Sequence, residues 1–228
     1  MLFILMGAAL LAAGAPDPLK GLPPVPSGAV RLFLVRHGQA LSNLDPAPKL
    51  PPAQLDHLTA LGREQASRAG TALKGHGVRI ILTSPAERGR ETAEVIRLAV
   101  GVGEATVEPR LRPLSLGFSP DGKALDWDAR IAEWKKGRDP VPEAGESMEQ
   151  VGARVAALAA ELARNRPGQE VLLVAHSEVI GAFVGHVEGT APALRYPPGI
   201  ANGSITVVEA WPDRPARIVL KSVTPPGP

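Results

Sequence analysis

Histidine and arginine side chains follow three short apolar runs of the sequence, at the point where each run ends. These side chains are Arg36 and His37 at the end of residues 30–35, Arg88 after residues 79–83, and His176 after residues 170–175. If the runs are parallel strands, their carboxyl ends open into one crevice of a sheet, and the side chains can converge there. Guanidinium groups donate planar pairs of hydrogen bonds that fit phosphate oxygens. The pattern therefore predicts a site for a phosphoryl group.

A histidine in such a site can act as a nucleophile when its ring is neutral and held by a hydrogen bond at its other nitrogen. Attack on phosphorus gives a phosphohistidine, which water then cleaves. Two arginines and a second histidine can supply the charge stabilisation that a metal provides in other phosphoryl-transfer sites. We expect no metal and no cofactor, because the five histidines, at positions 37, 57, 76, 176 and 186, have no metal-ligand spacing with nearby carboxylates.

Strand and helix patterns alternate along the chain. Strands are predicted at residues 30–35, 79–83, 170–175, 204–209 and 217–223, and helices at 59–74, from 84 onward, at 147–165 and after His176. Capping signals support three of the helices: Thr59, a capping box at Ser84 with Glu87, and a capping box at Ser147 with Gln150. This order predicts a three-layer α/β/α fold with a mostly parallel central sheet.

Composition narrows the function classes. The chain has 228 residues, a net charge of +2 and no cysteine, so thiolate metal sites, disulfides and cysteine nucleophiles are excluded. It has no long run of Lys and Arg, and aromatic residues make up only 4% of it, so we expect no nucleic-acid partner.

The chain divides into three regions by composition. Residues 1–15 are apolar and uncharged, residues 16–29 form a Pro-rich linker, and residues 30–224 carry the predicted domain. Fifteen residues are too few to span a bilayer of about 30 Å as a helix. We therefore expect a signal peptide and export to the periplasm or the medium, with membrane contact only through this leader. An uncleaved anchor and a cytoplasmic protein are the alternatives.

Several motifs in fixed order resemble the histidine phosphatase, or phosphoglycerate mutase-like, superfamily. They are Val35-Arg36-His37-Gly38-Gln39 with Asn43, Asp56 before Leu58-Thr59-x-x-Gly62-x-x-Gln65-Ala66, Ser84-Pro85-x-x-Arg88-x-x-Glu91-Thr92-Ala93, Gly145-Glu146-Ser147, Val174-Ala175-His176, and Asn202-x-Ser204. The resemblance implies a phosphoglycerate mutase-like fold, a phosphorylated His37, and phosphoryl oxygens held by Arg36, Arg88 and His176. It also places Asn43, Gly38 and Ser177 at the substrate. Two alternatives stay open: Asn43 as an ordinary turn residue, and Arg88 as a surface ion pair with Glu87 or Glu91.

The chain departs from the family pattern at the residue that protonates the leaving oxygen. Many mutase-like members carry a glutamate where this chain has Pro113, in Leu111-Arg112-Pro113-Leu114-Ser115-Leu116-Gly117. We expect Glu178 to replace it. The segment His176-Ser177-Glu178 resembles the acid-phosphatase and phytase branch, in which a carboxylate one or two residues after the second histidine donates the proton. A glutamate that only favours the dipole of the following helix is the alternative. Asp121, Asp126, Asp128 and Glu108 are weaker candidates.

These observations favour a phosphatase that hydrolyses phosphomonoesters over a mutase. A protein phosphohistidine phosphatase, and a pseudo-phosphatase that binds a phosphorylated ligand without turnover, are the alternatives. The partner is then a phosphorylated small molecule or a phosphoprotein. Substrate specificity is expected in residues 118–144, where Trp127 and Trp134 are expected to pack. The charges of this segment indicate either an anionic substrate or a solvated helix face, and they are Lys123, Arg130, Lys135, Lys136 and Arg138.

Overall fold

A computed structural model describes residues 17–196 and 199–226 of the chain. Within this part a six-stranded sheet has the order β3-β2-β4-β1-β5-β6. The strands are β1 (Val30–Arg36), β2 (Val78–Thr83), β3 (Thr106–Val107), β4 (Glu170–Ala175), β5 (Ile205–Ala210) and β6 (Arg217–Val223). The pairs β1–β4, β2–β4 and β2–β3 are parallel, whereas β5 and β6 add antiparallel strands at one edge. The mostly parallel sheet predicted from the sequence is confirmed.

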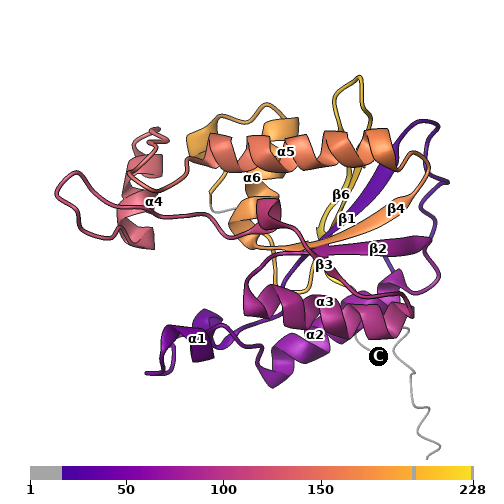
Figure 1. The fold of residues 1–228 in the computed structure, drawn as a ribbon, viewed down its shortest axis with the longest axis horizontal. Helices are drawn as coiled ribbons and strands as arrows, with labels where there is room; N and C mark the ends of the chain where they lie inside the picture. Colours follow the sequence, from indigo (N-terminus) through magenta and orange to yellow (C-terminus); the bar gives the residue numbers. More distant parts are fainter. Residues whose placement is uncertain (1–16, 197–198, 227–228) are drawn as a thin grey trace, which may run out of the picture.

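Helices cover both faces of the sheet (Figure 1). The pair α2 (Ala60–Leu73) and α3 (Glu87–Val100) lies on one face, and the pair α5 (Met148–Asn165) and α6 (Ser177–Val187) lies on the other. The shorter helices are α1 (Pro52–Leu55), α4 (Trp127–Lys135) and the 3₁₀ turns η1 (Leu41–Asn43), η2 (Pro109–Leu111) and η3 (Pro192–Leu194). None of the helices described is both long and apolar enough to cross a membrane.

Strand β1 contributes side chains to the two hydrophobic clusters that lie on opposite faces of the sheet. Its side chains alternate between the faces of the sheet. Leu32 and Leu34 pack with the apolar residues of α5 and α6, whereas Phe33 and Val35 pack with those of α2 and α3. All four side chains are fully buried, so β1 must lie in the middle of the sheet. The apolar run from Leu32 to Val35 is typical of a strand covered on both faces, and the buried Arg31 before it is paired with Glu170 and Glu209.

Two of the three predicted helix caps are confirmed and one is wrong. The Thr59 hydroxyl accepts the Gly62 N–H at 3.0 Å, and Ser147 forms the predicted capping box of α5. The third helix, α3, begins at Glu87 and not at Ser84, and its N-cap residue Ala86 has no side chain that could accept a hydrogen bond. The hydroxyl of Ser84 instead hydrogen-bonds His176, so tertiary structure takes precedence over the local signal.

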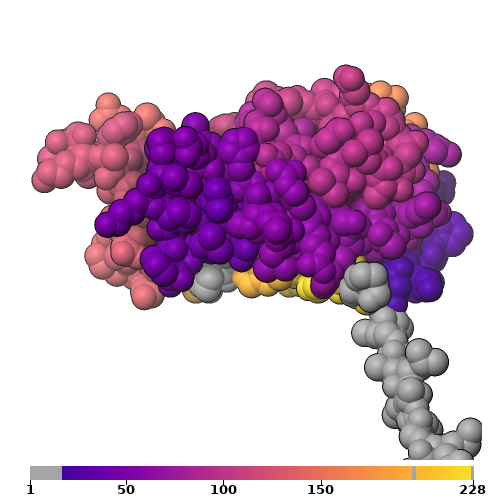
Figure 2. All heavy atoms as spheres, turned by 90° about the horizontal axis from the view of Figure 1, so that it is seen from below, coloured from indigo at the N-terminus to yellow at the C-terminus, as the bar shows by residue number. Residues whose placement is uncertain are grey.

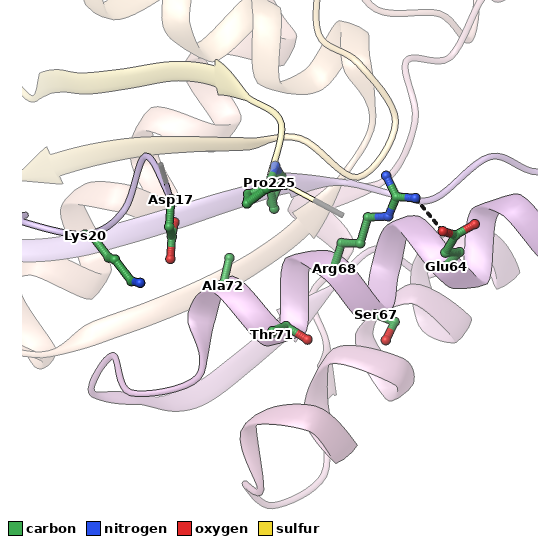
Figure 3. Close-up of a pocket in the computed structure, with 9 residues that line it drawn as sticks. Asp17, Lys20, Glu64, Ser67, Arg68, Thr71, Ala72 and Pro225 are labelled. Carbon is green, nitrogen blue, oxygen red and sulfur yellow. Dashed lines mark hydrogen bonds and ion pairs between the residues drawn. The ribbon is translucent and has the colours of Figure 1, made fainter. Parts of the chain in front are cut away.

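The Pro-rich segment packs onto the domain in the part that the structure describes. Leu19 is buried in the core beneath α2 and α3. Figure 3 shows Asp17 and Lys20 beside Pro225 and the α2 residue Ala72, with which they line a shallow pocket. The predicted leader, residues 1–15, lies outside the described residues.

Residues 118–144, which carry α4, extend beyond one end of the sheet. Figures 1 and 2 show this segment projecting from the body of the molecule. In Figure 1 the carboxyl ends of β2 and β4 point toward the same end. The segment in which we expect substrate specificity is therefore at the end of the sheet where the predicted site residues lie.

Candidate active site

The structure brings His37, Arg88 and His176 together at the carboxyl ends of β1, β2 and β4. His37 follows β1 and donates its backbone N–H to Ala175 at the end of β4, at 3.0 Å. His176 is the N-cap residue of α6, and Arg88 is the second residue of α3. The two imidazole rings are 5.0 Å apart between centroids, and both are almost completely buried. Residues distant in the sequence thus form one compact polar cluster.

The hydrogen bonds of His37 fix which of its nitrogens can react. Nδ1 is 2.8 Å from the Gly38 carbonyl oxygen, which can only accept, so Nδ1 carries the hydrogen. Nε2 is 3.1 Å from Nε of Arg88, which can only donate, so Nε2 presents a lone pair. Burial, and then the positive charge of Arg88, lowers the pKa of His37 from 6.5 to about 3. The ring is therefore neutral at physiological pH, with Nε2 available as a nucleophile.

His176 is held by two partners in the same way. Its Nδ1 accepts from Nη2 of Arg88 at 3.1 Å, so Nε2 carries the hydrogen and donates to the Ser84 hydroxyl at 2.7 Å. Burial, followed by the proximity of His37 and Arg88, lowers the pKa of His176 well below its usual value. Ser84 has no exposed surface, so this second histidine is fixed from the side of β2. The sequence analysis assigned Ser84 to a helix cap and missed this role.

Arg88 lies between the two histidines and is not a surface ion pair with Glu87 or Glu91. Its remaining nitrogen, Nη1, forms an ion pair with Asp56. Glu87 pairs with Arg90 on the outer side of α3. All three nitrogens of the Arg88 guanidinium thus have partners. Two of them face the histidines, and the third faces Asp56.

Arg36 presents an unsatisfied donor. Its Nη1 donates to the Ile200 carbonyl at 2.6 Å, but its buried Nε has no hydrogen-bond partner among the described residues. Burial lowers the pKa of Arg36, and the negative charge of Glu178 opposes that effect. Buried donors are rarely left unpaired, so Nε of Arg36 is suited to a ligand with acceptor oxygens.

The three predicted substrate-binding residues are near this cluster but form hydrogen bonds within the protein. Oδ1 of Asn43 accepts from the backbone of Ala40 at 3.0 Å, which closes its own turn, and lies 3.4 Å from Nδ2 of Asn202. The Gly38 N–H donates to Thr92 at 3.0 Å.

The third of these residues, Ser177, donates its hydroxyl to Glu178 at 3.2 Å. Asn202 is a residue that the family pattern contains and to which the sequence analysis gave no role. Its Nδ2 donates to the His37 carbonyl at 2.9 Å and so supports the backbone of that histidine.

Glu178 lies beside the segment where the family pattern has its acid. Its side chain is buried, and Oε1 accepts the N–H of Leu114, the residue after Pro113, at 3.4 Å. Its negative charge raises the pKa of Arg36, against the larger lowering by burial. The Glu178 carboxyl group, which comes from α6, thus lies next to Pro113, where the family pattern has a glutamate.

Three of the four weaker candidates for the acid have other partners. Glu108 is bound by Arg110, Asp126 caps α4, and Asp121 pairs with Lys123. These contacts hold the three carboxylates in local structure.

Four of the five basic residues of the 118–144 segment have acidic or backbone partners, and Lys123 pairs with Asp121. Lys136 and Arg138 both bind Glu133, which supports the interpretation of a solvated helix face. Arg130 is buried and donates to two backbone carbonyls, those of Pro140 and Glu146.

Trp134 packs as predicted, whereas Trp127 stays 37% exposed and packs only in part. Trp134 is buried, and its ring is 4.9 Å from that of Tyr196, while Trp127 stacks on Tyr196 at 5.5 Å. Burial, and then the charge of Glu178, raises the pKa of Tyr196. The cluster holds α4 against the chain that follows η3.

One group of metal-compatible ligands was missed because its members are distant in the sequence. Ligand atoms of His57, Glu87 and Glu91 lie within 4.8 Å of one another. The Glu91 carboxylate already binds Nδ1 of His57 at 2.6 Å and a guanidinium nitrogen of Arg63 at 2.9 Å. The hydrogen bond to Glu91 raises the pKa of His57. These contacts form an ion-pair network on the surface of α3.

Two buried histidines and two arginines thus lie together at the ends of parallel strands of an α/β/α fold, an arrangement that can bind a phosphoryl group. The family model described as histidine phosphatase superfamily (branch 1) matches residues 32–222, and the chain belongs to this superfamily.

Two relatives show the range of proteins that the chain resembles. It is 34% identical over 171 residues to the 2,3-bisphosphoglycerate-dependent phosphoglycerate mutase of Methylorubrum extorquens, covering 69% of this chain and 79% of that protein. Among solved structures, a mycobacterial glucosyl-3-phosphoglycerate phosphatase in complex with VO3 has a TM-score of 0.65 and 28% identity, covering 83% of this chain and 97% of the other. The superfamily and these neighbours support a phosphoryl-transfer enzyme.

Proposed function

We propose that this protein is a phosphatase that hydrolyses phosphomonoesters without a metal, through a phosphohistidine at His37. The observation that carries this proposal is the tautomer of His37, whose Nε2 lone pair is directed at the guanidinium of Arg88. A phosphoryl group that enters between these residues meets a nucleophile on one side and charged donors on the other. The unpaired Nε of Arg36 supplies a further donor.

The reaction has two steps. Nε2 of His37 attacks phosphorus, the bond from phosphorus to the leaving oxygen breaks, and that oxygen takes a proton. Water then attacks the phosphohistidine, which releases inorganic phosphate and restores the neutral ring. Arg36 and Arg88 stabilise the negative charge of the transferring group in both steps, which is the main requirement of phosphoryl transfer.

Glu178 is the proposed general acid. A protonated carboxyl group at this position would give its proton to the leaving oxygen and then, as a carboxylate, would take a proton from the attacking water. Its contact with the backbone of Leu114 supports this assignment, because it places the carboxyl group against the Pro113 segment. Glu178 would then perform from α6 the role that the glutamate has in mutase-like members.

A protein phosphohistidine phosphatase is the second candidate, and Pro113 favours it. The leaving group in that reaction is a ring nitrogen, which needs less help from a carboxylic acid than an alkoxide does. An enzyme that lacks the usual glutamate would retain this activity. Hydrolysis of a phosphohistidine peptide faster than of any phosphomonoester would select this candidate.

The test is release of phosphate from p-nitrophenyl phosphate by the full chain in excess EDTA. We expect activity that EDTA does not reduce and that His37→Ala abolishes. His186→Ala is the matched control, because His186 is a partly exposed histidine that pairs with Glu149 away from the cluster. A folded wild-type protein that binds phosphate but releases none from any phosphomonoester or phosphohistidine would contradict the proposal.

A further inference from the structure

Asp56 connects two parts of the active site that the sequence separates. It directly follows α1, whereas Arg88 lies on α3. One carboxylate oxygen of Asp56 forms the ion pair with Nη1 of Arg88. The other oxygen accepts the backbone N–H of Glu87 at 2.7 Å. A single side chain therefore holds both the guanidinium of Arg88 and the first turn of its helix.

The N-terminus of α3 needs this partner. Its own N-cap residue, Ala86, has no side-chain acceptor, and the hydroxyl of Ser84 is directed to the Ala86 N–H and to His176. The first N–H groups of a helix require acceptors from elsewhere. Asp56 supplies one from a separate segment, and its negative charge also favours the positive end of the helix dipole.

A second contact holds the Asp56 turn against the same helix. The Glu91 carboxylate, one turn further along α3, accepts the backbone N–H of Leu58 at 3.1 Å and binds His57 at 2.6 Å. The turn that carries Asp56 is thus bound to α3 at two points. This arrangement fixes the position of the Asp56 carboxylate independently of Arg88.

We propose that Asp56 is the positioning residue for Arg88. With Nη1 held by Asp56, the plane of the guanidinium is set so that Nε faces Nε2 of His37 and Nη2 faces Nδ1 of His176, each at 3.1 Å. An entering phosphoryl group takes over these two donors while Nη1 stays on Asp56. Arg88 therefore stabilises the transferring group without having to be ordered during the reaction.

Asp56→Asn is the informative substitution, because one amide oxygen can accept from Glu87 or from Arg88 but not from both. Whichever partner keeps the oxygen, the charge that pairs with Arg88 is lost and the amide nitrogen faces the other donor. Misplacement of a catalytic group by about 1 Å can cost on the order of 100-fold in rate, so we expect kcat to fall about 10- to 100-fold with a smaller change in KM. The matched control is Glu94→Gln, which removes an exposed ion pair of α3 with Arg97 and should change neither constant.

A double-mutant cycle with Arg88→Ala separates positioning from a general structural role. Calorimetric titration with inorganic phosphate measures affinity in the wild type, both single variants and the double variant. We expect Asp56→Asn to weaken phosphate binding more than twofold when Arg88 is present and less than twofold when Arg88 is already absent. Equal weakening in both backgrounds would overturn the proposal, as would an Asp56→Asn protein with wild-type kcat.

The catalytic part of this inference rests on the proposed function, but the binding cycle does not. If the wild type binds phosphate and hydrolyses no ester, the proposed function fails while the cycle still tests Asp56. If hydrolysis is found and the effects of the two substitutions on phosphate binding are independent, the positioning role fails alone. Thermal unfolding of Asp56→Asn, expected within a few degrees of the wild type, excludes misfolding as the cause of either loss.

Discussion

Burial of His37 should make the stability of this protein depend on pH in a way that can be assigned to one side chain. The pKa of His37 is about 3 in the folded protein against 6.5 for an ordinary histidine. Between these values the unfolded chain binds a proton that the folded chain does not, so stability falls as the pH falls. From pH 7 to pH 5, protonation of His37 in the unfolded chain removes about 2 kcal/mol from the free energy of unfolding.

The perturbation that isolates this effect is His37→Gln, which keeps a polar side chain but cannot be protonated. Urea unfolding of the wild type and the variant at pH 7, 6 and 5, in a buffer without phosphate, gives the two free energies of unfolding. We expect the wild type to lose about 2 kcal/mol more than the variant over this range.

His176 is the internal comparison, because its pKa is also lowered and it remains in the His37→Gln protein. A His176→Gln variant should likewise lose less stability than the wild type as the pH falls. Parallel loss of stability by wild type and His37→Gln would refute the reasoning, because it would mean that His37 titrates alike in the folded and unfolded chains.

Three further predictions concern the acid, the aromatic cluster and the backbone. Glu178→Gln should slow alkyl phosphates about 100-fold or more and aryl phosphates far less, since aryl oxides leave without a proton; steady-state rates with both classes test this, and equal losses would contradict the assignment. Trp134→Ala should lower the free energy of unfolding by about 3–5 kcal/mol, whereas Trp127→Ala, which loses mainly a stacked pair, should cost about 1 kcal/mol; equal costs by urea unfolding would oppose this. Gly38→Ala should prevent correct folding, because the added Cβ would lie 2.1 Å from the Gly62 carbonyl oxygen; a wild-type circular dichroism melt would show that the backbone can move.

The fold was predictable because its determinants are local. Apolar runs such as Leu32–Val35 indicate strands buried on both faces, and alternation with helical patterns indicates parallel connections. The caps at Thr59 and Ser147 could be read from single residues and their spacing. The cap at Ser84 could not, because that hydroxyl is taken by His176, a partner distant in the sequence.

The candidate site was predictable in its residues but not in its connections. The ends of three strands indicated where His37, Arg88 and His176 would meet. The sequence could not show that Asp56 binds Arg88, because that ion pair depends on how the turn after α1 packs against α3. The cluster of His57 with two glutamates was missed for the same reason, since its members come together only in the folded chain.

The central claim is that His37 carries the phosphoryl group, and chemical trapping tests it most directly. The full chain is mixed with p-nitrophenyl phosphate, quenched within milliseconds into base, in which phosphohistidine is stable, and digested for mass spectrometry. We predict a phosphoryl group on Nε2 of His37 in the wild type and none in His37→Ala. Steady turnover with no phosphorylated histidine, or with the phosphoryl group on another residue, would contradict the account.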